Sequence, residues 1–254
     1  MSRIGSDLSG AAKALRALHV PGAPVVLPNA WDVSSARVLA EAGYPAVATA
    51  SAAVTAALGY RDGHGMPADE AFAAVRRIAS AVDVPVTADI ERGYDLPPAR
   101  IAARLAEAGA VGCNLEDSDP AARTMVGLAE QVDFLAAVRA ADPDLVINAR
   151  IDVHVNGDGN FDETVRRALA YFEAGADCVF PLFLPADKVA AFVQAVGGRP
   201  VNIGHGPGSP SPARLTELGV ARVSFGPGLH NLLMRQLRSI VGDIKRDGGS
   251  PYGG

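Results

Sequence analysis

LAEAGAVGCNLEDS, residues 105–118, contains the pattern that decides the fold of this chain. The segment LAEAG is typical of an amphipathic helix that ends at a glycine, because Gly109 can adopt the left-handed backbone of a C-cap without a Cβ penalty. The apolar run VGCNLE at 111–116 then predicts a buried strand, which ends in the acid Glu116 and is followed by a second acid, Asp117. A helix, a glycine and a buried strand in this order form the repeating unit of a parallel α/β fold.

The same unit recurs along the chain. LAEAGY, FEAGA and LTELGV end at Gly43, Gly175 and Gly219, and each leads into a further apolar run. Eight candidate strands result: 25–29, 46–50, 85–89, 111–116, 145–150, 178–182, 200–204 and 222–226. Eight such units predict a (β/α)8 TIM barrel, preceded by an N-terminal helix and followed by a C-terminal helix near 229–244. A doubly wound sheet is the alternative, but PNAWD follows the first strand where that fold usually has a glycine-rich turn.

The composition indicates one domain and a small-molecule partner. The 254 residues, 49% of them hydrophobic, suffice for a single barrel domain over 1–245, and 246–254 are expected to form a flexible tail. A net charge of -5 argues against nucleic acid and acidic membrane surfaces as partners. No signal peptide and no apolar run of about 20 residues is evident. Two cysteines without CxxC spacing suit a reducing compartment, so a cytoplasmic location is expected.

Acidic residues gather at the predicted carboxyl ends of the strands, where barrels carry their chemistry. Asp89 and Glu91 follow one strand with a spacing of two, which predicts that both side chains face the same way. Glu116 ends the next strand, and Asp62 lies in the loop GYRDG. Converging carboxylates repel one another unless a cation joins them, and oxygen ligands alone favour Mg2+, with Mn2+ as a substitute. Alternatively, these acids cap helices or pair with arginines at the rim of the barrel.

A basic residue ends the fifth strand. Arg150, in NAR, is expected to face inward with Asn148 and to grip a substrate carboxylate through its planar guanidinium. An ion pair with Glu116 or Glu91 is the other reading, and the two roles are compatible.

Four motifs carry a family resemblance: GYRDG (59–63), PVTADIERGY (85–94), GCNLEDS (112–118) and NARID (148–152). In this order they resemble the isocitrate lyase / phosphoenolpyruvate mutase superfamily, in its phosphonomutase-like branch. The resemblance implies a barrel whose C-terminal helix is exchanged between subunits of a dimer or tetramer. It also implies enolate chemistry beside a 2-oxo acid, with Mg2+ as the cofactor.

The resemblance also assigns roles to residues. Asp89 matches a direct metal ligand, whereas Glu91 and Glu116 match acids that hold the metal mainly through water. Asp62 and Arg150 are the expected catalytic residues, and Arg150 is also expected to bind the substrate carboxylate. Ser51, Ala52 and Asn202 complete the expected substrate-binding set.

One departure from the superfamily narrows the expected reaction. Its lyases carry a lid with the sequence Lys-Lys/Arg-Cys-Gly-His, whereas this chain has EDSDPAARTMVG at 116–127 and Ser118 in place of the lysine of the mutases. The expected function is therefore a Mg2+-dependent carbon–carbon lyase of a small 2-oxo dicarboxylate, most similar to an oxaloacetate decarboxylase.

Several alternatives stay open. A lyase of a bulkier 2-hydroxy or 2-oxo acid, similar to methylisocitrate lyase, would need Tyr60, Tyr94 or His205 as its acid or base. Phosphonopyruvate or phosphoenolpyruvate P–C chemistry is a second alternative. GHGPGS at 204–209 would suit a sugar-phosphate enzyme. A non-catalytic binder of 2-oxo acids is the last.

Overall fold

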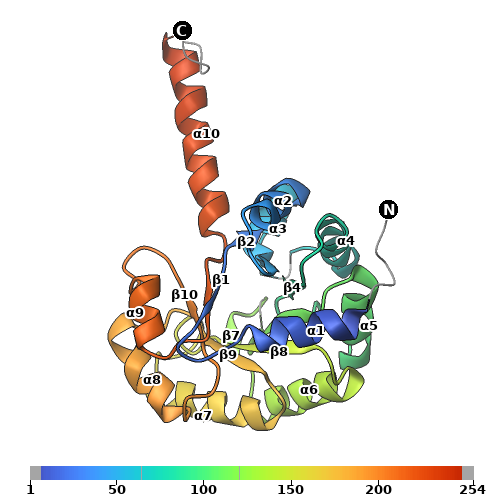
Figure 1. The fold of residues 1–254 in the computed structure, drawn as a ribbon, viewed down its shortest axis with the longest axis vertical. Coiled ribbons are helices and arrows are strands. Elements are labelled where there is room, and N and C mark those ends of the chain that lie inside the picture. The colour runs from blue at the N-terminus through green and yellow to red at the C-terminus, as the bar shows by residue number, and fades with distance from the viewer. Residues whose placement is uncertain (1–6, 64, 120, 248–254) are drawn as a thin grey trace.

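The computed structural model describes residues 7–63, 65–119 and 121–247, and it confirms the predicted barrel (Figure 1). All eight predicted strands are present, and the first is split in two. The parallel strands are β1 (Val25–Leu27), β2 (Asn29–Ala30), β3 (Val47–Thr49), β4 (Val86–Asp89), β5 (Gly112–Glu116), β8 (Val146–Ile151), β9 (Cys178–Pro181), β10 (Asn202–Gly204) and β11 (Arg222–Ser224). An antiparallel pair, β6 (Ser118–Asp119) and β7 (Thr124–Met125), adds a small hairpin.

The barrel closes through two joints. Its ladders form a six-stranded sheet in the order β2-β3-β4-β5-β8-β9 and a three-stranded sheet in the order β1-β11-β10. Pro28, which has no N–H to donate, separates β1 from β2. A single parallel bridge between Val179 and Val201 joins β9 to β10. At the first joint, the side-chain amide of Asn29 makes three hydrogen bonds. Its Nδ2 donates to Thr49 O (2.7 Å), and its Oδ1 accepts from the backbone N–H groups of Phe225 (2.8 Å) and Gly226 (2.9 Å).

Helices cover the outside of the barrel and one of its ends. They are α1 (Leu8–Ala17), α2 (Val33–Glu41), α3 (Ser51–Leu58), α4 (Ala68–Ala79), α5 (Pro98–Ala108), α6 (Leu128–Ala141), α7 (Phe161–Glu173), the 3-10 turn η1 (Ala186–Lys188), α8 (Val189–Ala195), α9 (Pro212–Glu217) and α10 (Gly228–Asp247). Leu15 of α1 is buried with Val25 and Val146 at the amino end of the barrel. A Cβ at Gly112 would lie 2.7 Å from Leu15, so only glycine admits this plug.

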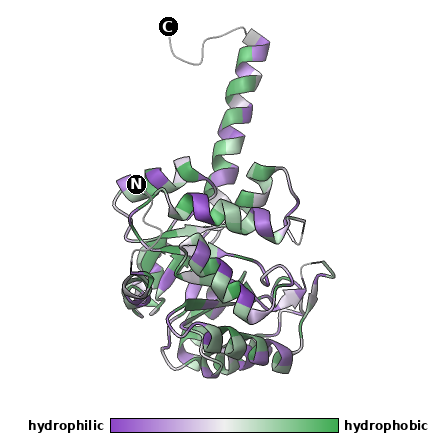
Figure 2. Cartoon of the chain, turned by 90° about the vertical axis from the view of Figure 1, so that its right-hand side faces the viewer, coloured by the Kyte–Doolittle hydropathy of each residue, from purple (hydrophilic) through white to green (hydrophobic). Residues whose placement is uncertain are grey.

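Helix α10 stands away from the barrel (Figure 1). Apolar and polar residues alternate along it (Figure 2), and five large apolar side chains are exposed: Leu232, Leu233, Leu237, Val241 and Ile244. The helix ends at Asp247, so the first two residues of the expected tail are helical, and 248–254 lie outside the described residues. Exchange of this helix between subunits stays a prediction. None of the described helices combines the length and apolar character needed to cross a membrane.

Candidate active site

The predicted acids and Arg150 meet at the carboxyl end of the barrel. Asp89 is the last residue of β4, Glu116 is the last residue of β5, and the ladder register pairs Glu116 with Arg150 in β8. Asp62 belongs to the same group: burial, and after it the charge of Asp89, raises the pKa of its carboxyl above the ordinary value. The site therefore gathers charged side chains from three neighbouring strands and one loop.

Asp89 has one satisfied oxygen and one open oxygen. Its Oδ2 accepts hydrogen bonds from Ser51 N (3.0 Å) and from Ser51 Oγ (2.9 Å). Its Oδ1 is buried and has no hydrogen-bond partner among the described residues. Because a buried carboxylate oxygen is costly to leave unpaired, this atom points to a ligand.

Glu91 lies beyond the strand that was expected to orient it. Strand β4 ends at Asp89, and Glu91 adopts a left-handed backbone with φ 52°. Tyr94 (φ 54°) and Asp95 (φ 59°) share this conformation, which is strained for non-glycine residues. The spacing-of-two argument is therefore wrong for Glu91, because a turn sets its direction. Glu116 N donates to Glu91 O (3.1 Å), which holds the turn against β5.

Arg150 is engaged by two acids on neighbouring positions. Its Nη1 lies 2.7 Å from Glu116 Oε2, as the ion-pair reading predicted. Its Nε and Nη2 donate to the two carboxylate oxygens of Asp152 at 2.6 and 3.0 Å. The forked edge expected to hold the substrate thus holds Asp152, so a substrate carboxylate would meet only the remaining N–H groups.

A buried network behind the site fixes Asp152 and was missed in the sequence. Asp152 accepts from Ser118 Oγ (2.6 Å), and its backbone N–H donates to Asp117 (2.7 Å). Asp117 also accepts from Tyr171 Oη (2.6 Å) and Arg167 Nη1 (3.1 Å). The available signal was that Asp117 directly follows Glu116 in GCNLEDS and that Asp152 lies two residues after Arg150 in NARID. The network ties the ends of β5 and β8 to α7 and so orients Arg150.

The electrostatics of the site favour a cation. Burial raises the pKa of Glu116 to about 9, Asp152, Asp89 and Glu91 add to the effect, and Arg150 opposes it. Burial disfavours the charge on Arg150, but Glu116 and Asp152 outweigh this and raise its pKa. One guanidinium thus faces an excess of carboxylates, which a divalent ion would relieve.

The residues fit a magnesium ion held largely through water. In the described parts of the chain, no three His, Cys, Asp or Glu side chains lie close enough to ligate a metal directly. Mg2+ usually keeps several of its waters and uses one or two carboxylates. The open Oδ1 of Asp89 suits a direct ligand, and Glu91, Glu116 and Asp62 suit contacts to bound water.

The expected substrate-binding residues come from two elements, α3 and β10. Ser51 and Ala52 are the first residues of helix α3, where the first N–H groups lack partners within the helix. Ser51 donates its own N–H to Asp89. Asn202, fully buried in β10, has no hydrogen-bond partner for either amide atom among the described residues. Both positions can therefore accept a polar ligand.

The hairpin β6–β7 occupies the place of the superfamily lid. Ser118 in this hairpin donates its hydroxyl hydrogen to Asp152 and so supports the carboxylate that holds Arg150. Of the alternative acids, Tyr94 is buried, and burial together with Glu91, Asp89, Asp62 and Glu116 raises its pKa well above the ordinary value. Its hydroxyl therefore stays protonated beside the acids. Tyr60 is exposed, and His205 Nδ1 is buried without a partner among the described residues.

Comparisons with known proteins agree with this geometry. The family model for phosphoenolpyruvate phosphomutase matches residues 15–245. A Corynebacterium glutamicum protein assigned as a 2-methylisocitrate lyase is 32% identical over 254 positions, covering 93% of this chain and 81% of that protein. A Burkholderia cenocepacia structure assigned as a phosphonomutase has a TM-score of 0.85 and 39% identity, covering 91% and 98% of the two chains. A phosphonopyruvate hydrolase bound to oxalate and Mg2+ has a TM-score of 0.85 and 26% identity, covering 95% and 89%.

Proposed function

The chain belongs to the phosphoenolpyruvate phosphomutase family, and we propose that it is a Mg2+-dependent carbon–carbon lyase of a small 2-oxo dicarboxylate. Membership confirms the predicted superfamily and makes the chain an enzyme of lyase or mutase chemistry. The observation that carries the finer proposal is the buried, open Oδ1 of Asp89 within an excess of carboxylates. The related hydrolase that binds oxalate, an enolate mimic, together with Mg2+ supports it.

The reaction closest to the site is the decarboxylation of oxaloacetate. The bond from C3 to its carboxylate breaks, CO2 leaves, the electron pair passes to the C2 oxygen, and a proton added at C3 gives pyruvate. A bound Mg2+ would supply Lewis acidity at the C2 oxygen. Asp89 would hold this ion directly, with Glu91, Glu116 and Asp62 on its waters.

The chain itself positions the substrate and retains a proton donor. The free N–H groups of Arg150 and the first turn of α3 at Ala52 offer hydrogen bonds to a carboxylate. Tyr94 is a candidate donor to C3 because it is buried beside the acids, although its burial and these acids raise its pKa and so make it a weaker acid. Cleavage of the isocitrate type and P–C chemistry are less favoured, because the lid cysteine and lysine of the superfamily have no counterpart in EDSDPAARTMVG.

A coupled assay tests the proposal. Purified protein with oxaloacetate and Mg2+ should form pyruvate faster than Mg2+ alone, and EDTA or Asp89→Ala should abolish the excess. Asp133→Asn, on the exposed side of α6, is the matched control and should keep the rate. Equal rates for wild type and Asp89→Ala would exclude the decarboxylase. Phosphonopyruvate and methylisocitrate in the same assay test the alternative lyases.

Thermal unfolding separates an enzyme from a non-catalytic binder. Mg2+ plus oxalate should raise the melting temperature of the wild type, because a ligand that binds only the folded state stabilises it. A shift without turnover of any tested acid would support the binder. An unchanged melting temperature with Mg2+ plus oxalate would contradict the proposed binding site itself.

A further inference from the structure

A buried arginine points into the barrel from the strand that closes it. Arg222 is the first residue of β11, and only 1% of it is exposed. The next residue, Val223, belongs to the buried core that also contains Val193 of α8 and Leu215 of α9, so it faces the helices. Successive residues of a strand point to opposite faces, so Arg222 and Ser224 point into the barrel. The hydrogen bond from Arg222 Nε to Ser224 Oγ (3.1 Å) agrees with this.

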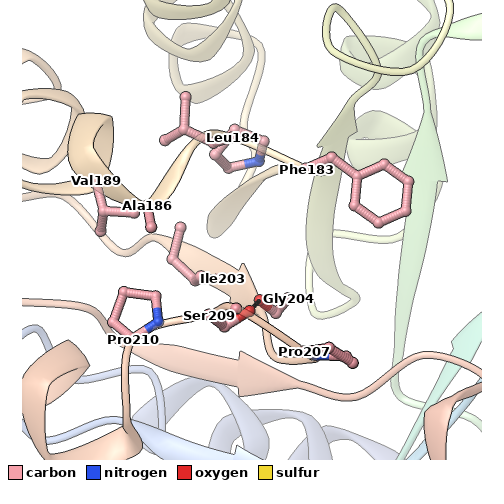
Figure 3. Close-up of a pocket in the computed structure, with 11 residues that line it drawn as sticks. Phe183, Leu184, Ala186, Val189, Ile203, Gly204, Pro207, Ser209 and Pro210 are labelled. Atoms are coloured by element: carbon pink, nitrogen blue, oxygen red, sulfur yellow. Dashed lines mark hydrogen bonds between the residues drawn. The ribbon is translucent and has the colours of Figure 1, made fainter.

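The neighbouring strand points a polar residue the same way. Asn202 of β10 is the ladder neighbour of Arg222, and both of its amide atoms are buried without a hydrogen-bond partner among the described residues. Figure 3 shows the next residue, Ile203, at a cavity that Leu184 and Val189 of α8 also line, so Ile203 faces the helix layer. Asn202 therefore faces the interior together with Arg222.

Arg222 has no acid partner. Within residues 7–63, 65–119 and 121–247, no ion pair includes it, and its Nη1 is buried without a hydrogen-bond partner. Arg150 and Arg167, in contrast, each contact an acid at the same end of the barrel. A buried cation without a counter-ion is costly, so its place in the interior calls for an explanation.

Asp89 supplies the negative charge that acts on Arg222. Burial lowers the pKa of Arg222 to about 10, and Cys178, Asp89 and Cys113 oppose this shift, so the guanidinium stays charged at neutral pH. Burial raises the pKa of the Cys178 thiol to about 12 and also raises that of Cys113, so both thiols are neutral. Asp89 is therefore the one anion of the three, and its open Oδ1 is the expected metal ligand.

This coupling has opposite consequences for a cation and for an anion. A divalent ion at Asp89 takes up the negative charge that offsets Arg222, and the two positive charges then repel each other. An anionic ligand on that ion restores the missing negative charge. A guanidinium in the interior thus disfavours the metal alone and favours an anion on the metal-loaded site.

We propose that Arg222 sets the charge balance of the candidate active site: it weakens the binding of a divalent ion alone and strengthens the binding of a dianion to the metal-loaded site. The inference rests on the proposed function, because it requires the metal at Asp89. Arg222 acts through its charge and needs no contact with the substrate. If the arginine only filled space, its loss would change both affinities in the same direction or neither.

Two titrations of a neutral variant test this inference. Arg222→Met removes the charge and keeps an apolar side chain of similar length, and replacing an unpaired buried charge in this way is often neutral for folding. At pH 8 the His19 imidazole beside Arg222 is neutral in both proteins. The variant should bind Mn2+ about tenfold more tightly in electron paramagnetic resonance titrations. Under saturating Mg2+ it should bind oxalate about tenfold more weakly in calorimetry.

Two further variants separate charge from packing. Arg222→Gln is equally neutral but polar, and it should show the same pair of opposite changes. Arg199→Met, which removes a half-buried arginine paired with Glu173 before β10, is the matched control and should leave both affinities unchanged.

The wild type distinguishes the two levels of the argument. If it binds Mn2+ and oxalate but the neutral variants change both affinities in the same direction, or neither, the inference is overturned and the proposed function stands. Loss of folding in both Arg222 variants would make the arginine structural and would overturn the inference as well. If the wild type binds neither Mn2+ nor oxalate, the proposed function fails, and the inference fails with it.

Discussion

Arg150 and Glu116 meet across neighbouring strands at the mouth of the barrel, with Nη1 2.7 Å from Oε2. Asp152 occupies the other edge of the same guanidinium. The guanidinium of Arg150 thus holds two buried acids, Glu116 and Asp152, in place, and the geometry of the candidate site depends on it.

Replacement of Arg150 should destabilise the protein strongly. Arg150→Met leaves Glu116 and Asp152 buried without their cation, which we expect to cost about 3–5 kcal/mol of unfolding free energy. Urea denaturation in EDTA measures this loss. Arg214→Met, which breaks an exposed pair with Glu217, should cost under about 1 kcal/mol. Equal losses for the two variants would contradict the role assigned to Arg150.

Ser51 should control metal affinity without contacting the metal. Ser51→Ala removes the Oγ hydrogen bond to Asp89 Oδ2 but keeps the backbone N–H. Loss of such a supporting contact typically weakens metal binding about 10- to 100-fold. Electron paramagnetic resonance titration with Mn2+ reads this directly. Ser34→Ala, exposed on α2, is the control, and an unchanged Mn2+ affinity in Ser51→Ala would refute the prediction.

His19 should make stability depend on pH. Burial, and then Arg222, lowers the pKa of this imidazole to about 4, so the folded protein keeps it neutral. The unfolded chain binds the proton near pH 6.5, so stability is full above that value and falls as the pH drops toward 4. The expected contribution lost between pH 7 and pH 5 is about 2 kcal/mol. Denaturation curves of wild type and His19→Gln at both pH values check it, and a variant with the same pH dependence would contradict it.

Helix α10 should mediate assembly of the protein. Its exposed leucines have no partner surface among the described residues of one chain, and burying them against a second copy would be favourable. We expect a dimer or tetramer in light-scattering measurements. Leu237→Glu should shift it toward the monomer, whereas Arg238→Glu, also exposed on α10, should shift it less. A wild-type monomer would exclude helix exchange.

The strands and the acidic end of the barrel could be predicted from the sequence, because each depends on a local pattern. An apolar run after a glycine, such as VGCNLE after Gly109, specifies a buried strand, and the direction of parallel strands brings Asp89 and Glu116 to one end. The ion pair between Asp152 and Arg150 was not predictable from a local pattern, because residues 34 and 35 positions away hold Asp152: Ser118 donates to its carboxylate, and Asp117 accepts from its backbone N–H. The direction of Glu91 depends on a left-handed turn that a strand pattern cannot encode.

The break at Pro28 and the exposure of Phe183 also escaped the pattern. Both depend on tertiary structure. The side chain of Asn29 makes hydrogen bonds where the strand ladder is interrupted, and Phe183 has a left-handed backbone where the chain leaves β9. Apolar periodicity records which residues are buried, but it does not record which hydrogen bonds hold a joint.

The lone bridge between Val179 and Val201 makes the junction of β9 and β10 the thinnest part of the cylinder wall. Few backbone hydrogen bonds must break there for the wall to part, so its amides should exchange with deuterium before those of the ladder between β5 and β8. A cavity lined by Pro181 and Gly204, among others, opens at the carboxyl ends of these two strands. A ligand bound in this cavity would hold β9 and β10 together, and slower amide exchange on both strands would indicate its binding.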